Sequence, residues 1–220
     1  MAEYKRSLIV ELWLKIFSLL RWISPFQIVR KLIPSSIDIY FVEGWVLGNF
    51  LLSIVSYFIL FMWSDPNVYW WETIAICWGA IRVFEVTIYQ INVLLFDWYR
   101  ASKEGKPYAV RGFLRLIILL LHNYVEIIFW FALFYRNMNW AFETGGLALD
   151  SFLVSLNFSF VTMTTFGHSN VFPKTDVGYI LTLIQSAIGL FMALLILARF
   201  ISLIPSPKTS DRVEKQYTDA

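Results

Sequence analysis

The sequence predicts an all-α integral membrane protein with four transmembrane helices, a short re-entrant helix and polar loop before the fourth, and an amphipathic interfacial helix near its amino terminus. Of the 220 residues, 58% are hydrophobic and 19% aromatic, more than a soluble domain needs for its core. Four apolar segments are long enough to cross a bilayer. A polar, threonine-rich stretch at residues 162–173 lies between two apolar segments. At membrane depth, such backbone is tolerated only inside protein or along a water-filled path.

Residues 1–37 form an amino-terminal segment in which apolar residues recur at helical spacing, with basic residues largely between them. The pattern predicts an amphipathic helix in the membrane interface over residues 3–32, interrupted at Ser24-Pro25. We favour a helix that anchors the chain or packs against the rest of it. The alternative is a helix that couples the membrane surface to the functional part of the protein.

Residues 38–112 hold two predicted transmembrane helices, at residues 39–63 and 68–96, and most of a basic loop. In this loop, at residues 97–115, Lys and Arg outnumber Asp and Glu by five to two. Because positively charged loops stay on the cytoplasmic side, we expect the loop and both chain termini to be cytoplasmic. A bacterial inner membrane and a eukaryotic plasma membrane both suit such a multi-pass chain.

Arg82 and Glu85 lie well inside the second predicted span, three residues apart and therefore on one helix face. Glu126, with His122 one turn earlier, lies inside the third span. An unpaired charge at membrane depth is costly, so we expect an intramembrane ion-pair network between Arg82 and these carboxylates. A voltage sensor is disfavoured, because it needs several regularly spaced arginines and Arg82 is the single arginine of its span.

The remainder of the chain divides into a domain at residues 113–204 and a tail at residues 205–220, which we expect to be disordered and cytoplasmic. The domain consists of a third span at 113–135, an external linker at 136–146, a short helix at 147–163, the polar stretch, and a fourth span at 176–204. The short helix cannot span a bilayer, so we expect it to re-enter the membrane from the external side.

The polar stretch reads Thr162-Met163-Thr164-Thr165-Phe166-Gly167-His168-Ser169-Asn170-Val171-Phe172-Pro173, and it follows Ser155-Leu156-Asn157-Phe158-Ser159-Phe160-Val161. Together they resemble the pore helix and pore signature of tetrameric-type potassium channels, particularly two-pore-domain and small prokaryotic ones, whose usual signature is T-x-T-T-x-G-[YF]-G-D-x-x-P. Residues 179–200 resemble the inner, pore-lining helix of that family. The resemblance covers residues 113–204 and implies that they are a pore domain.

The resemblance implies a homotetramer, since the chain carries one such loop and the filter of this family needs four. It assigns the ion-conduction filter to Thr164, Thr165, Phe166, Gly167, His168 and Ser169, supported by Thr162 and Asn170. The ligands of K+ would be the carbonyl oxygens of Thr165, Phe166, Gly167 and His168, with the Thr165 hydroxyl. Gly189 matches the family's gating hinge, although close helix packing would equally explain a glycine there. K+ or Na+ is the expected permeant ion, and no cofactor is expected.

Three residues depart from the family's pattern: His168 replaces an aromatic residue, Ser169 replaces the second filter glycine, and Asn170 replaces an acidic residue. A side chain with a Cβ is disfavoured in the left-handed conformation that a filter needs. We therefore expect strain at Ser169 and a weaker preference for K+ over Na+, or a filter that inactivates readily. His168 either packs behind the filter, which we favour, or titrates between about pH 5 and 8 and reduces the current in external acid.

Other function classes fit the sequence poorly. The net charge of +2 gives no sign of nucleic-acid binding, and His122, His168 and Cys77 assemble no catalytic or metal-binding motif, so an enzyme is not expected. One re-entrant loop without an inverted repeat does not suit a transporter. We therefore expect a cation channel whose partners are further copies of the chain and membrane lipids. The alternative is a non-conducting, channel-derived subunit with a regulatory or binding role.

Overall fold

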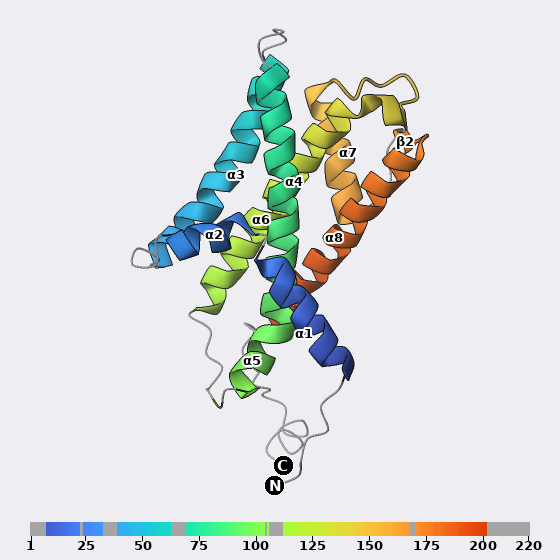
Figure 1. The fold of residues 1–220 in the computed structure, drawn as a ribbon. Coiled ribbons are helices and arrows are strands. Elements are labelled where there is room, and N and C mark those ends of the chain that lie inside the picture. Colours follow the sequence, from blue (N-terminus) through green and yellow to red (C-terminus); the bar gives the residue numbers. More distant parts are fainter. Residues whose placement is uncertain are drawn as a thin grey trace, which may run out of the picture.

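The computed structural model of the 220-residue chain describes residues 8–22, 24–32, 39–62, 69–103, 105, 112–167 and 170–201. The expected tail at residues 205–220 lies outside this part of the chain, and so do His168 and Ser169. Within the described residues the fold is helical apart from one pair of two-residue strands (Figure 1). This confirms the prediction of an all-α protein.

Four of the described helices are long and apolar enough to cross a membrane: α3 (Ile39–Met62), α4 (Tyr69–Ile91), α6 (Phe113–Asn137) and α8 (Asp176–Ile201). Each begins within one residue of the start predicted from its apolar run. A helix of about 20 apolar residues is enough to cross the hydrocarbon core. The chain therefore has the helices of a multi-pass integral membrane protein.

The second predicted span, at residues 68–96, is wrong as a single α-helix. α4 ends at Ile91 and continues as one π-helical stretch, η3 (Asn92–Phe96), followed by α5 (Asp97–Lys103) in what was expected to be loop. The buried Asn92 amide donates to the carbonyl oxygen of Ile88 at 2.9 Å and accepts from Arg100 Nη1 at 3.3 Å. The π-helical stretch therefore begins at a buried, hydrogen-bonded asparagine.

The predicted amphipathic segment forms two helices, α1 (Leu8–Arg21) and α2 (Pro25–Leu32), which meet at Ser24. The carbonyl oxygen of Ser24 accepts the backbone N–H groups of Gln27 and Ile28, at 3.0 and 3.2 Å. Proline suits the first position of a helix because its missing N–H would be unsatisfied there anyway. Both helices contact α4, and Figure 1 shows α1 crossing its lower end while α2 lies beside the lower part of α3.

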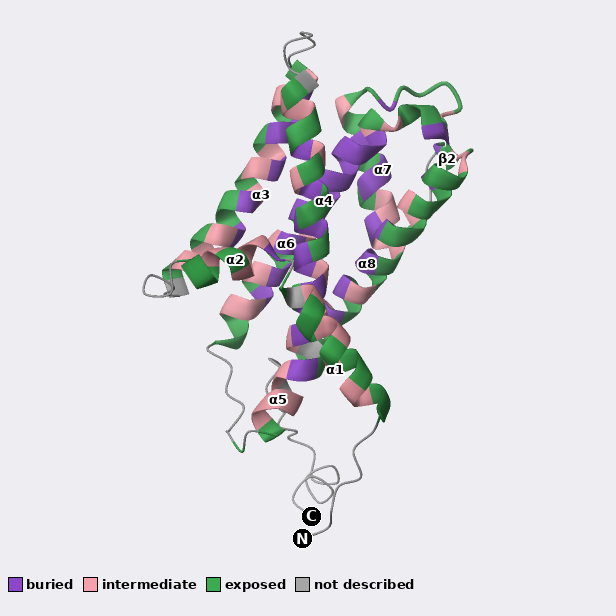
Figure 2. Cartoon of the chain, viewed as in Figure 1, coloured by how far each residue is buried: buried purple, intermediate pink, exposed green. Residues whose placement is uncertain are grey.

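α6 is the central helix of the fold. It contacts α3, α4, α7 (Phe152–Thr164) and α8, and 56% of its most apolar stretch is buried, against 22% for α8. Figure 2 shows the buried residues concentrated where α3, α4 and α7 face α6. α6 therefore joins the first two long helices, α3 and α4, to α7 and α8.

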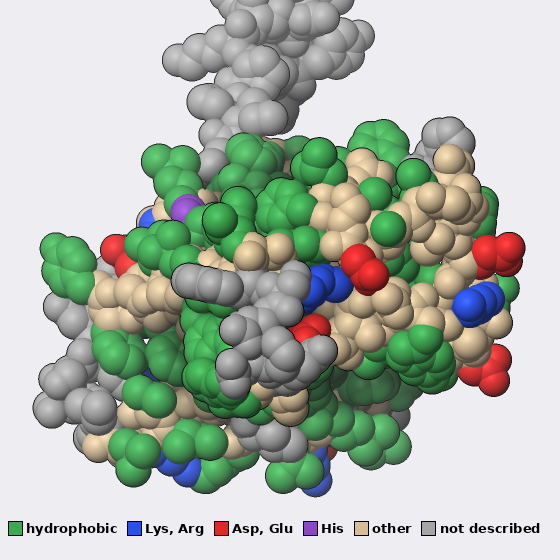
Figure 3. All heavy atoms as spheres, turned by 90° about the horizontal axis from the view of Figure 1, so that it is seen from above, with side chains coloured by type: hydrophobic (Ala, Val, Ile, Leu, Met, Phe, Trp, Pro, Cys, Tyr) green, Lys and Arg blue, Asp and Glu red, His purple; other side chains and the backbone are tan. Residues whose placement is uncertain are grey.

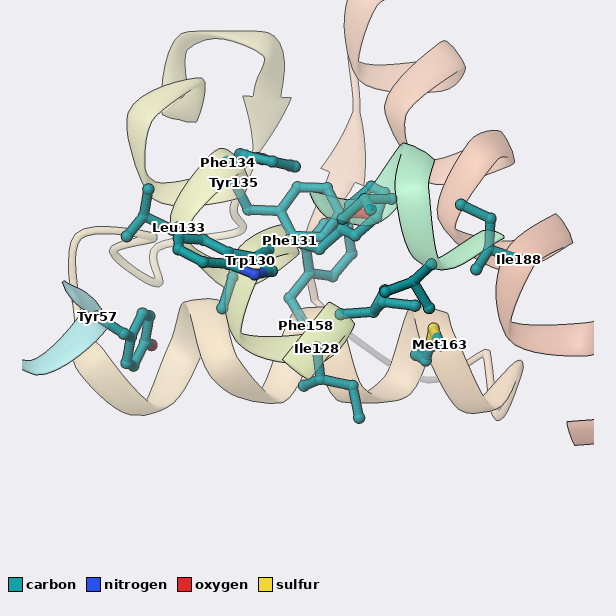
Figure 4. Close-up of a cluster of buried hydrophobic side chains, with 14 of the residues drawn as sticks. Tyr57, Ile128, Trp130, Phe131, Leu133, Phe134, Tyr135, Phe158, Met163 and Ile188 are labelled. Atoms are coloured by element: carbon teal, nitrogen blue, oxygen red, sulfur yellow. The ribbon is translucent and has the colours of Figure 1, made fainter. Parts of the chain in front are cut away.

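Aromatic side chains fill the interior between α6 and its neighbours (Figure 4). The rings of Tyr135 on α6 and Phe158 on α7 lie 4.5 Å apart between centroids, and Phe131 packs against Tyr135 at 6.1 Å. Tyr57 of α3 approaches Phe152 at the start of α7, with 4.8 Å between ring centroids. Such pairs add about 0.5–1.5 kcal/mol each beyond the area that they bury. They hold α7 against two long helices.

A short linker joins α6 to α7. It contains η4 (Asn139–Ala141) and strand β1 (Phe142–Glu143), which pairs antiparallel with β2 (Phe172–Pro173) beyond the polar loop. α7 starts at Phe152 rather than at residue 147 as predicted. Asn139 donates to the carboxylate of Asp150 at 2.8 Å, which ties the residues before α7 to this linker.

Candidate functional site

The candidate site is the polar stretch at the end of α7. With 13 residues, this helix is about 20 Å long, so it covers only part of a hydrocarbon core of about 30 Å. It runs inward from the end of the molecule at which α6 ends and α8 begins (Figure 1). Its last residue is Thr164, and the chain then turns sharply through Thr165, Phe166 and Gly167.

The turn contains two residues with left-handed backbone. Thr165 has φ 58° and ψ 22°, and Gly167 has φ 70°. The backbone N–H of Phe166 donates to the carbonyl oxygen of Val161 at 3.2 Å, which closes the end of the helix. Gly167 thus has a backbone φ in the left-handed region that favours glycine.

Thr165 is the one non-glycine residue with positive φ in the described part of the chain. A β-branched side chain is strongly disfavoured there, at a cost of about 1–2 kcal/mol. Backbone strain was expected from the sequence at Ser169, which lies outside the described residues, and not at Thr165. Strain of this kind persists where surrounding contacts impose it, and it gathers at functional sites.

Two of the threonine hydroxyls of the site donate to their own helix. Thr162 Oγ1 donates to the carbonyl oxygen of Phe158 and Thr164 Oγ1 to that of Phe160, each at 2.8 Å. Thr165, Phe166 and Gly167 are exposed, and Phe166 is 78% exposed. The turn therefore lies on the surface of the single chain, where another chain can reach it.

Gln185 joins α8 to both α6 and α7. This fully buried amide donates to the carbonyl oxygen and the hydroxyl of Ser159, at 3.0 and 2.8 Å, and accepts from the Tyr135 hydroxyl at 2.7 Å. Ser159 Oγ in turn donates to the carbonyl oxygen of Ile128 on α6 at 2.7 Å. Away from water such bonds are costly to lose, so this chain of contacts fixes the depth and rotation of α7.

Replacing Gln185 with leucine is expected to lower the free energy of unfolding by about 1–3 kcal/mol, because the Tyr135 hydroxyl and the Ser159 groups lose a buried partner. The measurement is the unfolding temperature of the purified protein in detergent. Thr182→Val is the matched control, since the Thr182 hydroxyl bonds only to carbonyl groups of its own helix. Equal shifts for the two variants would contradict a special role for Gln185.

Gly189 lies against the carboxyl-terminal end of α7. A Cβ at this position would overlap the carbonyl oxygen of Met163 and lie 2.8 Å from its carbonyl carbon. The Tyr124 hydroxyl of α6 donates to the same Met163 oxygen at 3.3 Å. Met163 is therefore held between α6 and α8 two residues before Thr165, and the structure gives Gly189 a close-packing role.

A buried charge network lies about halfway along α4 and α6. Arg82 Nε and Nη2 each donate to one carboxylate oxygen of Glu126, both at 2.9 Å, and Nη1 donates to Glu85. The three residues are 2%, 0% and 4% exposed, in the order Arg82, Glu126, Glu85. A bidentate arginine–carboxylate pair is strong and geometrically specific. It ties α4 to α6.

The two carboxylates of this network have further partners. Glu85 accepts from the Ser24 hydroxyl and from the backbone N–H of Phe26 at 2.7 Å, and Glu126 accepts from Trp130 Nε1 at 3.1 Å. The negative charge of Glu85 thus lies at the start of α2, where the helix dipole favours it. The network therefore links the α1–α2 corner to the central helix.

Other predicted residues lie elsewhere. His122 is not part of the charge network: its Nδ1 lies 2.7 Å from the carbonyl oxygen of Ile118, and its ring meets that of Phe50 at 5.1 Å. Asn170 is exposed beside Gly145, and the loop then returns to β2. His168 and Ser169 lie outside the described residues. Among those residues, no group of three or more His, Cys, Asp and Glu is placed to hold a metal ion.

Four polar residues that hold the helices together were not predicted from the sequence: Gln185, Tyr135, Tyr57 and Ser24. One signal was available, because a glutamine in the middle of a long apolar span has to find a partner inside the protein. The hydroxyl of Tyr57 also needs a partner inside the protein, and it bonds to the carbonyl oxygen of Phe152 and to Ser155 Oγ on α7. Which partners these groups choose depends on how the helices pack.

Comparison with known proteins supports the channel interpretation of this region. Residues 118–205 match the family model described as an ion channel. The match starts in α6 and ends just beyond α8, so it includes α7 and the polar loop. No curated protein and no solved structure matches the chain.

Proposed function

We propose that the chain is one subunit of a four-fold cation channel that conducts K+, with a filter formed by residues 165–169 of each subunit. The end of α7 carries this proposal. A helix of 13 residues ends at Thr164 and continues into a turn with positive φ at Thr165 and Gly167, exposed on the surface of the chain. Carbonyl oxygens presented by such a turn in four subunits can replace part of the hydration shell of an ion.

Electrostatics supports a cation rather than an anion at this place. The carboxyl-terminal end of a helix carries a partial negative charge of about half an elementary charge. α7 ends at Thr164, directly before the turn, and four such ends around one axis would attract a cation below the filter. In the proposed orientation α7 re-enters the membrane from the external side and both chain termini are cytoplasmic.

The surface of the single chain supports assembly. α8 is the least buried of the four long helices, with large apolar side chains such as Tyr179, Leu183 and Leu194 exposed. Seen from the end at which α7 begins, hydrophobic side chains cover much of the rim (Figure 3). In a tetramer, neighbouring subunits would cover part of this surface and lipids would cover the remainder.

Flux through purified protein in liposomes tests the proposal, with K+ and Na+ gradients compared in parallel. K+ flux well above Na+ flux is the expected result. Equal fluxes would retain a cation pore but contradict a K+-selective filter. A folded tetramer that passes neither ion would favour the alternative of a non-conducting subunit, to which the replacement of filter residues by Ser169 and Asn170 points.

The variant Ser169→Gly is expected to raise the permeability ratio of K+ over Na+ about fivefold. This corresponds to a change of about 1 kcal/mol in the free-energy difference between the two ions, expected because glycine adopts left-handed backbone without the steric cost that a Cβ adds. The matched control is Ser169→Ala, which removes the hydroxyl but keeps the Cβ and should leave the ratio near that of the unchanged protein. An unchanged ratio in Ser169→Gly, or an equal rise in both variants, would contradict strain as the cause.

A further inference from the structure

A groove of about 680 Å³ lies where α1 meets α5. Its walls are formed by one face of α1, including Leu14 and Lys15, by Trp22 directly after α1, and by Lys103 at the end of α5. A second hollow, of about 350 Å³, shares Ser18 and Trp22 with it and extends between α1 and α2. The two hollows form one continuous surface around Trp22.

The charge of this surface favours an anion. Lys15 and Lys103 line the larger hollow and Lys31 the smaller one, where its ammonium group lies 3.1 Å from the centre of the Trp22 ring. Glu11 is the one acidic residue along the two hollows, and it is engaged in an interaction of its own. Within the described part of the chain, Lys15 and Lys103 have no acidic partner at ion-pair distance.

The same surface is strongly apolar. Trp22 is 62% exposed and Leu19 is 70% exposed, although both line the groove. Exposed leucine beside tryptophan and lysine is the composition of a surface at the membrane–water boundary. A small soluble anion would leave these apolar side chains uncovered, whereas a lipid would cover them with its acyl chains.

The position of the groove also fits a lipid. α1 and α5 lie at the end of the bundle where α4 ends and α6 begins, which is cytoplasmic in the proposed orientation (Figure 1). The contact of Ser24 and Phe26 with Glu85 holds the α1–α2 corner at α4, so the groove is built on a fixed support. Anionic lipids of the cytoplasmic leaflet attract lysines at about this depth.

We propose that the groove between α1 and α5 binds an anionic phospholipid of the cytoplasmic leaflet, with its phosphate between Lys15 and Lys103 and its acyl chains along Leu19 and Trp22. The site lies outside the pore domain, and its occupancy does not depend on ion conduction. It would give the amino-terminal helices a specific lipid ligand rather than a general affinity for the membrane.

Native mass spectrometry of the full chain in detergent tests this site, with phosphatidylglycerol and phosphatidylcholine of the same acyl chains as probes. The unchanged protein is expected to bind the anionic lipid more tightly than the neutral one. The double variant Lys15→Gln/Lys103→Gln should lose about 30-fold in affinity for phosphatidylglycerol, because each lysine contributes about fivefold to the attraction. Its affinity for phosphatidylcholine should not change.

Arg30→Gln/Lys174→Gln is the matched control, because it removes the same charge at exposed positions that line neither hollow. It should keep the preference for phosphatidylglycerol. An equal loss in the control would overturn the proposal in favour of general charge attraction. Displacement of the lipid by glycerol phosphate at comparable concentration would overturn it in favour of a small-anion site. Should the double variant not purify, Lys103→Gln alone is expected to lose about fivefold.

Discussion

The variant Arg82→Gln is expected to lose about 3–5 kcal/mol of stability and to yield little folded protein, because it leaves two buried carboxylates without their cation. Glu85 and Glu126 are almost completely buried in the middle of the helix bundle, where an unpaired charge is poorly solvated. The total stability of a domain is about 5–15 kcal/mol, so this loss takes a large part of it. The yield and the unfolding temperature in detergent measure the effect.

Arg115→Gln is the matched control for this experiment. It breaks the pair between Arg115 Nε and Glu43 of α3, whose side chains are 30% and 34% exposed, so the expected loss is at most about 1 kcal/mol. Adding Glu126→Gln to Arg82→Gln removes one of the stranded charges and should restore part of the stability. An Arg82→Gln protein as stable as the Arg115→Gln protein would contradict the structural role of the network.

The variant Gly189→Ala is expected to reduce K+ flux at least tenfold and to lower stability by about 1–3 kcal/mol, the usual cost of overpacking. The added methyl group meets backbone atoms of Met163, which cannot move aside as a flexible side chain would. The end of α7 or α8 therefore has to shift, and Thr165 lies two residues beyond Met163. Liposome flux and thermal unfolding of the same preparation measure both effects.

Gly48→Ala provides the control for Gly189→Ala, since a Cβ at Gly48 would meet nothing within 4 Å. In a helix interior, alanine is favoured over glycine by about 0.5–1 kcal/mol, so this variant should be at least as stable as the unchanged protein. A hinge role for Gly189 makes a different prediction, namely normal stability with altered opening. Finding that result would contradict the packing role.

The long helices could be predicted from the sequence because each one is a continuous apolar run, and such runs have few alternatives in a bilayer. The position of the polar loop could be predicted equally well, since Thr162, Thr164 and Thr165 cluster between apolar segments. The pairing of Arg82 with Glu126 could also be predicted, because an unpaired charge at membrane depth is costly. Each of these features follows from the composition of a short stretch of sequence, without knowledge of how the helices pack.

Contacts that depend on how two helices rotate against each other could not be predicted in this way. Gly189 was compatible with a hinge and with close packing until its distance from Met163 was known. Thr165 gave no sign of left-handed backbone, because threonine has no preference for it and the conformation is imposed by its neighbours. The sequence around Asn92 likewise predicts an ordinary helix, and nothing in it distinguishes the π-helical pattern that the structure has there.

An electron cryomicroscopy map of the purified protein in K+ would test the central claim most directly. The account predicts four chains around one axis, with the carboxyl-terminal ends of the four α7 helices directed at that axis. It also predicts ion density between the rings of carbonyl oxygens at Thr165, Phe166 and Gly167. A different number of chains, or α7 ends that face away from the axis, would contradict the proposed pore. A four-fold assembly with no ion density on its axis would contradict conduction by this filter.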